Sequence, residues 1–162
     1  MHTSYRRAGL DAHELVLLHG QPGSAADWQQ VTGRLPARLH PVATDRPGYG
    51  SSQLPAGGFA VNARAVVDDL DSRGITRAVL VGHSYGGGVA LSAASLAPGR
   101  VAAVVLLASV GPGCLPDARL QLVEGAGHHL PRRAPEAVAD AIVAFLPAAR
   151  INDVPITQPA AT

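Results

Sequence analysis

One serine stands in a pattern that could support nucleophilic chemistry. Ser84 is flanked by Gly82 and Gly86 in a G-x-S-x-G sequence, after the apolar residues 78–81 and before apolar residues with helical spacing. A serine at such a strand-to-helix turn is held out above the end of the strand, and glycines on either side let the two backbones approach closely. The bare pattern also arises by chance in Gly-rich loops, but the flanking strand and helix favour a nucleophile elbow.

A serine hydroxyl needs a base to accept its proton, and histidine is the most common one. The sequence offers His128 and its neighbour His129 in a segment of small residues, 125–129. We favour His128 as the base, because it follows the last expected strand in the usual chain order of such sites, and His129 is the alternative. An exposed loop histidine is the competing interpretation. A metal site is disfavoured because no cluster of carboxylates or cysteines accompanies the pair.

Acyl transfer also requires hydrogen-bond donors for the negative charge that develops on the substrate oxygen. The backbone N–H of Tyr85, directly after the serine, is one expected donor. The second is the N–H of Gln21 in the segment HGQPG, for which a plain strand-to-helix turn is the alternative. Asp45 follows another strand, on the far side from His128, so we expect it to tie its own loop rather than act as a catalytic acid.

Strands and helices alternate along the chain around these residues. We expect strands at 14–18, 39–44, 78–81, 101–108 and 118–123. Helices are expected after Ser24, over 59–73, after the elbow and over 135–145. This alternation predicts an α/β fold with a doubly wound, mostly parallel sheet of about five core strands. The candidate residues should then gather beyond the carboxyl ends of the strands, where such sheets bind ligands.

Length and composition narrow the interpretation further. The 162 residues predict a single domain over 1–162, with a peripheral tail at 148–162, and the net charge of +1 gives no sign of nucleic acid or membrane as a partner. The chain has no lysine, which excludes a P-loop lysine, a Schiff-base lysine and a Ser-Lys pair. Cys114 is the single cysteine, and no signal or membrane-spanning segment is evident, so we expect a cytoplasmic protein.

Four motifs together resemble those of the α/β-hydrolase fold-1 family, in the same order along the chain: HGQPG (19–23), DRPGYGSS (45–52), GHSYGG (82–87) and GAGHH (125–129). The resemblance covers about residues 14 to 147. It implies Ser84 as nucleophile, His128 as base, and Gln21 and Tyr85 as oxyanion-hole amides. Serine in place of aspartate at the elbow disfavours epoxide hydrolases and haloalkane dehalogenases and leaves esterase, lactonase, carbon–carbon hydrolase or perhydrolase chemistry.

The sequence departs from the family pattern before its last strand. Only residues 109–117 separate the fourth and last strands, so we expect a minimal, capless protein without the acid-bearing strand and with the flavodoxin-like order 2-1-3-4-5. Candidates for orienting His128 are Ser109, Glu124, Asp117 or a carboxylate of a second subunit. Asp117 begins the last strand, roughly 20 Å from its other end, which is too far for a hydrogen bond.

The sequence therefore predicts a slow serine hydrolase for small carboxylic esters, with broad specificity and with no cofactor or metal. The alternative is a catalytically silent binding protein or truncated remnant that keeps the elbow without a working triad. Nucleotide or flavin binding is disfavoured, because no G-x-G-x-x-G opens the first helix. Apolar surface left by the absent cap and strand predicts a homodimer or a larger homo-oligomer.

Overall fold

A computed structural model of the protein describes residues 14–109 and 127–148. Within these residues a parallel sheet has the strand order β2-β1-β3-β4. Its strands are β1 (Glu14–Leu18), β2 (Pro41–Thr44), β3 (Ala78–His83) and β4 (Val101–Leu107). The predicted α/β fold is confirmed. The strand expected at 118–123 and the tail at 148–162 fall almost entirely outside the described residues, so these and the single domain stay predictions.

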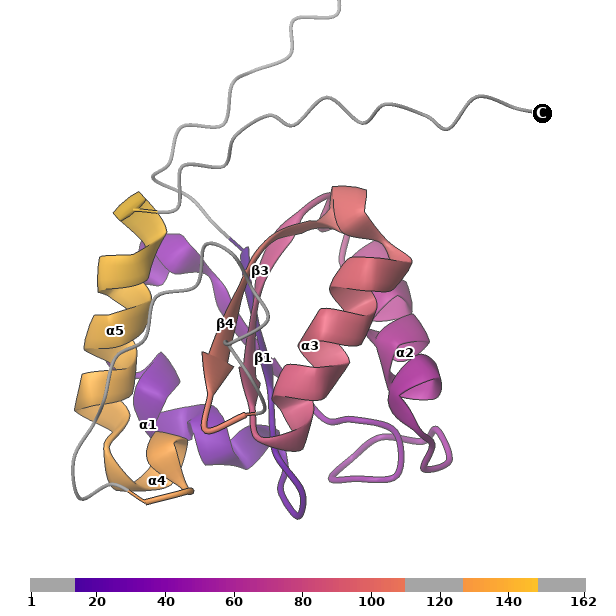
Figure 1. Ribbon diagram of the computed structural model, residues 1–162, viewed down its shortest axis with the longest axis horizontal. Coiled ribbons are helices and arrows are strands. Elements are labelled where there is room, and N and C mark those ends of the chain that lie inside the picture. The colour runs from indigo at the N-terminus through magenta and orange to yellow at the C-terminus, as the bar shows by residue number, and fades with distance from the viewer. Residues whose placement is uncertain (1–13, 110–126, 149–162) are drawn as a thin grey trace, which may run out of the picture.

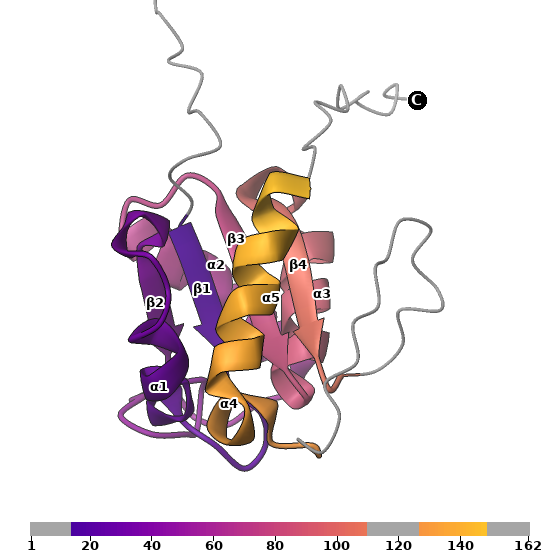
Figure 2. The ribbon, with the colours of Figure 1, turned by 90° about the vertical axis from the view of Figure 1, so that its left-hand side faces the viewer.

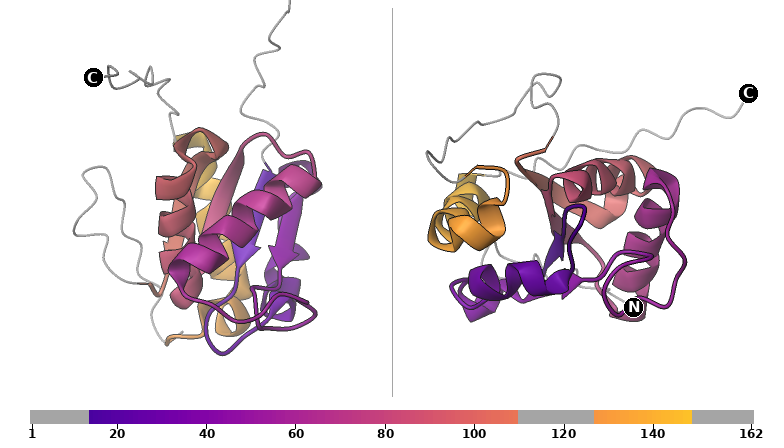
Figure 3. Two further views of the ribbon diagram at one scale, coloured as in Figure 1. Left: turned by 90° about the vertical axis from the view of Figure 1, so that its right-hand side faces the viewer. Right: turned by 90° about the horizontal axis from the view of Figure 1, so that it is seen from below.

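Helices cover both faces of the sheet. They are the 3-10 helices η1 (Ala25–Trp28), η2 (Ala37–Leu39) and η3 (Pro98–Arg100), and the α-helices α1 (Gln29–Thr32), α2 (Phe59–Ser72), α3 (Tyr85–Leu96), α4 (Leu130–Arg133) and α5 (Pro135–Ala148). Helices α1 and α5 lie on one face and α2 and α3 on the other, as Figures 1 and 3 show. In the part of the chain that the structure describes, no helix combines the length and the apolarity needed to cross a membrane.

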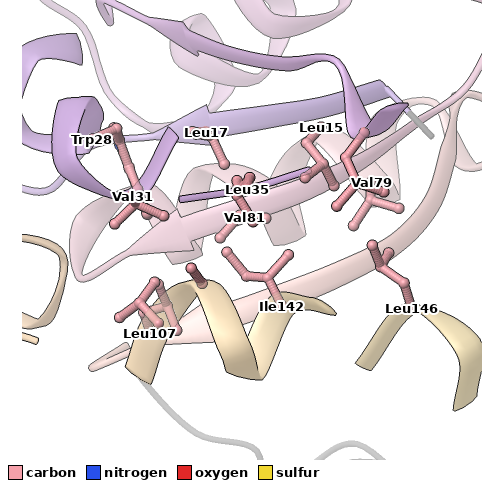
Figure 4. Close-up of a cluster of buried hydrophobic side chains, with 13 residues drawn as sticks. Leu15, Leu17, Trp28, Val31, Leu35, Val79, Val81, Leu107, Ile142 and Leu146 are labelled. Carbon is pink, nitrogen blue, oxygen red and sulfur yellow. The ribbon is translucent and has the colours of Figure 1, made fainter. Parts of the chain in front are cut away.

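Alternate residues of the central strands point into two separate hydrophobic cores, one on each face of the sheet. Leu15 and Val79 point to the face covered by α1 and α5, where they pack with Trp28 and Ile142 (Figure 4). Val16 and its neighbours on β3 belong to the second cluster, under α2 and α3. Because side chains alternate across a strand, a strand segment buried on both faces must be apolar at successive positions, as residues 15–18 and 78–81 are. Each fully buried Leu, Val or Ile stabilises the fold by about 1.5–3 kcal/mol.

The boundaries of some elements differ from the sequence prediction. The second strand begins at Pro41 rather than at residue 39, because η2 buries Leu39 in a 3-10 turn before the strand starts. The helix after Ser24 is divided into η1 and α1, and α1 ends before Gly33. The short helix α4 was not expected, since four residues are too few to show helical periodicity in the sequence.

All strands of the described sheet run in the same direction, so their carboxyl ends lie along one edge. Figure 2 shows the arrowheads of β1 and β4 pointing toward this edge, with α4 beside it. The loops that follow β1, β2, β3 and β4 therefore leave the sheet close to one another, as the parallel topology predicts.

Candidate active site

Ser84 occupies a sharp turn between β3 and α3. Its backbone has φ 51° and ψ −117°, a strained conformation for a residue with a side chain. A Cβ at Gly82 would lie 2.4 Å from the carbonyl oxygen of Gly86, and a Cβ at Gly86 would lie 2.2 Å from the carbonyl oxygen of Leu18. Both positions therefore admit only glycine. The N–H of Ser84 donates to the carbonyl of Leu107 (2.9 Å), which ties the turn to β4.

The side chains of Ser84 and His128 meet across 44 residues of sequence. Oγ of Ser84 lies 2.8 Å from Nε2 of His128, a hydrogen-bond distance. With the ring proton on Nδ1, Nε2 is free to accept the hydroxyl proton. The structure brings His128 to the serine and leaves His129, the alternative base, at the N-terminus of α4, where its carbonyl accepts from the N–H of Arg132.

Two contacts hold the segment that carries His128. Nε2 of His83, a buried side chain, donates to the carbonyl oxygen of His128 (2.6 Å). Arg132 of α4 binds the carboxylate of Asp27 in η1, with Nε 2.9 Å from Oδ1. Burial lowers the pKa of His83, although its hydrogen bond to His128 opposes the shift. His83 is therefore neutral near pH 7 and can donate from Nε2.

Gln21 and Tyr85, the two backbone donors expected from the sequence, line the same pocket as Ser84. Tyr85 is the first residue of α3, so its N–H has no partner within the helix, and among the described residues no acceptor is bonded to it or to the N–H of Gln21. A Cβ at Gly20 would lie 2.8 Å from Nδ1 of His83, so this glycine lets the Gln21 loop lie directly against the elbow.

A pocket of about 660 Å³ opens over these residues. It is lined by Gln21, Phe59, Ser84, Tyr85, Gly88, Ala108, Ser109 and His128. The rings of Phe59 and Tyr85 stack with their centroids 4.5 Å apart, and Phe59 covers Gly88, where a Cβ would lie 2.6 Å from the ring. Part of the pocket wall is therefore aromatic and apolar.

The residue that orients the ring of His128 is not found among the described residues. The hydroxyl of Ser109, one of the three candidates within the chain, donates to the backbone carbonyl of Ser84 (2.9 Å) and is not bonded to the histidine ring. Glu124 and Asp117, the other two, lie outside the described residues. Within residues 14–109 and 127–148, no carboxylate is hydrogen-bonded to His128.

Asp45 has the loop role that the sequence predicts. Its Oδ1 accepts the N–H of Ala25 (2.7 Å), and its Oδ2 accepts both the N–H and the hydroxyl of Ser51 (2.9 Å each). Burial by itself would raise the pKa of Asp45, but these hydrogen bonds outweigh it and hold the pKa below its ordinary value. The carboxylate is thus fully engaged in joining its own loop to η1.

Three charged or titratable residues buried around the site were not singled out from the sequence. They are His83, described above, and the pair His19 and Arg46, in which the N–H of Arg46 donates to Nε2 of His19 (3.1 Å). Burial lowers the pKa of His19. All three lie inside the four motifs that resemble the family. The sequence signal that could have identified them is a charged or titratable residue at, or within two residues of, the end of an apolar strand. Among the described residues, no group of three or more His, Cys, Asp or Glu could hold a metal ion.

Comparison with known proteins gives this geometry a family context. Residues 15–121 match the model of the alpha/beta hydrolase family. A putative carbamate hydrolase RutD of Variovorax paradoxus is 42% identical over 127 residues, covering 72% of this chain and 47% of that protein. A non-heme chloroperoxidase of Streptomyces lividans is 41% identical over 109 residues, 63% of this chain and 38% of that protein. The chain thus spans less than half the length of these relatives.

Solved structures agree with the fold. The crystal structure of a predicted CIB-like hydrolase from Thermoplasma acidophilum has a TM-score of 0.73 at 22% identity, covering 84% of this chain and 86% of that one, a likeness of fold alone. A thermophilic esterase from Thermogutta terrifontis has a TM-score of 0.58 at 25% identity, covering 61% of this chain and 38% of that one. The strand order, the elbow and the family match over residues 15–121 lead to one conclusion: this chain belongs to the alpha/beta hydrolase family.

Proposed function

We propose that this protein is a serine hydrolase that cleaves small carboxylic esters through an acyl-serine intermediate. The observation that carries the proposal is the 2.8 Å contact between Oγ of Ser84 and Nε2 of His128, at the mouth of a pocket that Gln21 and Tyr85 also line. A nucleophile within hydrogen-bond reach of a base, beside unpaired backbone donors, is the arrangement that acyl transfer requires.

The proposed reaction has two steps. In the first, Nε2 of His128 takes the hydroxyl proton while Oγ of Ser84 attacks the ester carbonyl, and the N–H groups of Gln21 and Tyr85 bind the resulting oxyanion. The protonated His128 then gives its proton to the departing alkoxide, which leaves an acyl-serine. In the second step, water transfers a proton to His128 and attacks the acyl group. His128 then returns this proton to Oγ as the bond between the acyl group and Ser84 breaks, which releases the carboxylic acid and restores the serine hydroxyl.

The pocket supports small, apolar acyl or alcohol groups as substrates. Phe59 and Tyr85 supply an aromatic wall, and Ala108 adds an apolar contact close to Ser84. We propose slow turnover, because no carboxylate among the described residues orients the ring of His128. Loss of the acid from a serine triad costs about 10⁴ in turnover in a well-studied protease, while the oxyanion hole and substrate binding keep part of the rate.

The lack of an orienting carboxylate within residues 14–109 and 127–148 also favours a second candidate, a binding protein that keeps the elbow without turnover. The two candidates differ in the reactivity of Ser84. An activated serine reacts stoichiometrically with a fluorophosphonate, whereas an unactivated one does not.

The direct test is hydrolysis of 4-nitrophenyl acetate and butyrate by the wild type, Ser84→Ala and His128→Gln. We expect both substitutions to lower kcat at least about 100-fold. Ser72→Ala, in the exposed last turn of α2, is the matched control and should retain the wild-type rate. Hydrolysis by Ser84→Ala at the wild-type rate would refute the proposal, and so would a wild type that neither hydrolyses these esters nor is labelled by a fluorophosphonate.

We further propose that the protein acts as a cytoplasmic homo-oligomer without a cofactor. The inner five residues of β4, the last strand of the described sheet, are only half-buried although all are apolar. Apolar strands with incomplete cover favour association. Sedimentation at micromolar concentration should give at least twice the chain mass, and a monomer mass would contradict this part of the proposal.

A further inference from the structure

Arg46 is a buried cation without an ionic partner among the described residues. The residue is 2% exposed, and no carboxylate oxygen in residues 14–109 or 127–148 lies within 4 Å of its guanidinium nitrogens. A buried charge is costly unless other groups compensate it. The compensating groups here are two backbone carbonyls, one amide oxygen and two tyrosine rings. Three of them, the Gly20 carbonyl, the Asn62 amide and the Tyr85 ring, connect Arg46 to residues that line the pocket.

The first connection reaches the Gln21 donor. Nη2 of Arg46 donates to the carbonyl oxygen of Gly20 (2.9 Å), and Nε donates to the carbonyl oxygen of His19 (3.0 Å). Nδ1 of His19 binds the same Gly20 oxygen (2.8 Å). In a trans peptide the C=O and the following N–H point in opposite directions. A Gly20 carbonyl held toward Arg46 therefore turns the N–H of Gln21 away from it, toward the pocket that Gln21 lines.

The same bonds also affect the strength of the Gln21 donor. A charged donor on the Gly20 oxygen polarises the whole peptide group, and hydrogen bonds in a chain strengthen one another. Because the Gln21 N–H belongs to that peptide group, it becomes a better donor to an oxyanion.

The second connection reaches Tyr85, whose N–H is the other proposed donor. The guanidinium carbon of Arg46 lies 4.6 Å from the ring centroid of Tyr85 and 4.5 Å from that of Tyr49. A guanidinium at this distance from an aromatic face is attracted to it, more strongly when both are desolvated. The Tyr85 ring also stacks on the ring of Phe59. The first residue of α3 is thus fixed by its side chain as well as by its backbone.

The third connection reaches the rim of the pocket. Nη1 of Arg46 donates to Oδ1 of Asn62 (3.3 Å) and so fixes the orientation of this buried amide. Nδ2 of Asn62 then donates to the carbonyl oxygens of Gly57 (2.7 Å) and Gly58 (2.9 Å), directly before Phe59. The position of the Phe59 ring therefore depends on the same cation.

We propose that Arg46 is a positioning residue that aligns both backbone donors of the oxyanion hole, Gln21 and Tyr85. The inference rests on the proposed function, since an oxyanion forms only if Ser84 attacks a carbonyl. A residue that merely joined loops would set the amount of folded protein, whereas Arg46 sets how well the folded protein stabilises the transition state.

The test compares an aryl ester with the corresponding thionoester in Arg46→Met and Arg46→Lys. Sulfur accepts hydrogen bonds poorly, so an aligned oxyanion hole favours the oxygen ester strongly. We expect Arg46→Met to lower kcat on the ester about 10- to 100-fold with less than about a threefold change in KM, and to shrink the ester-to-thionoester rate ratio about tenfold. Arg46→Lys, which keeps the charge but loses the planar fork, should lie between. Arg64→Met, on the exposed side of α2, is the matched control.

The rate ratio does not depend on the fraction of folded protein, so an unchanged ratio in both Arg46 variants would overturn the inference. If Arg46→Met does not fold, Arg46→Lys carries the comparison. If the wild type hydrolyses no ester, the proposed function fails. The role of Arg46 in positioning the two backbone N–H groups is then tested by NMR, which needs no substrate. The backbone amide NMR resonances of Gln21 and Tyr85 should both shift in Arg46→Lys and stay in place in Arg64→Met, and unmoved resonances in Arg46→Lys would overturn it.

Discussion

Nε2 of His83 lies 2.6 Å from the backbone carbonyl oxygen of His128. The residue directly before the serine thus holds the main chain of the residue whose ring binds that serine. Backbone and side chain of His128 are both fixed to the elbow, by two successive residues of the chain. This hydrogen bond anchors a segment whose side chains are exposed and are therefore held by little packing.

Replacing His83 should therefore affect turnover more than substrate binding. We expect His83→Ala to lower kcat on 4-nitrophenyl acetate about tenfold, which corresponds to about 1.4 kcal/mol, with little change in KM. His83→Gln, whose amide can donate in place of the ring, should recover part of the loss. Steady-state kinetics of both variants makes the comparison. Equal kcat in the wild type and in His83→Ala would show that this hydrogen bond does not position the base.

Stability should fall in weak acid because of His19. Its neutral ring donates from Nδ1 to the Gly20 carbonyl and accepts at Nε2 from the Arg46 N–H, and burial lowers its pKa in the folded state. Above about pH 6.5, the ordinary histidine pKa, both folded and unfolded chains are neutral at this position and the contribution is complete. Below it the unfolded chain binds protons first, so the free energy of unfolding decreases by up to about 1.4 kcal/mol per pH unit for each such histidine.

Urea unfolding at pH 5.0, 6.0 and 7.5 measures this slope. His19→Gln should flatten it, and His19→Gln combined with His83→Gln should flatten it further, because burial lowers the pKa of His83 as well. If neither variant changes the slope of the free energy of unfolding against pH, the loss of stability in weak acid does not arise from these two histidines.

Gly86 should tolerate no side chain. An added Cβ would lie 2.2 Å from the carbonyl oxygen of Leu18 and 2.7 Å from that of His19, both of which are backbone atoms that cannot move aside. We expect Gly86→Ala to destabilise the protein by about 3 kcal/mol or more, or to prevent folding. At Gly99 an added Cβ would meet nothing within 4 Å, so Gly99→Ala is the matched control. Thermal or urea unfolding of the two variants decides the point, and equal stabilities would refute the predicted clash.

Phe59 should limit the size of the substrate. Its ring stacks on Tyr85 and covers Gly88 at the wall of the pocket. We expect Phe59→Ala to raise the ratio of kcat/KM for 4-nitrophenyl octanoate over the acetate about tenfold, because removing the ring opens apolar space for a longer chain. Phe59→Leu, which keeps most of the apolar volume, should change the ratio less. A ratio unchanged in Phe59→Ala would place the acyl chain elsewhere.

The local features of this protein follow from the sequence alone. The apolar runs of β1, β3 and β4 predict buried parallel strands, and the spacing of Gly82, Ser84 and Gly86 predicts the sharp turn, because both depend on residues that are neighbours in the chain. The direction of the strands then places the loops at one edge of the sheet. The α/β fold and the family could be predicted in this way.

Tertiary structure alone decided which side chains touch within that edge. It set Nε2 of His128, the base that the sequence favoured, at hydrogen-bond distance from Ser84. It also placed the hydroxyl of Ser109 on the backbone of the elbow and surrounded Arg46 with carbonyls and aromatic rings. Periodicity reports which face of an element is buried, whereas these contacts join loops 25 or more residues apart. Each polar group that is buried in these loops must form a hydrogen bond. Which partner it finds depends on the groups that lie within reach, and only the packing of the whole chain determines those.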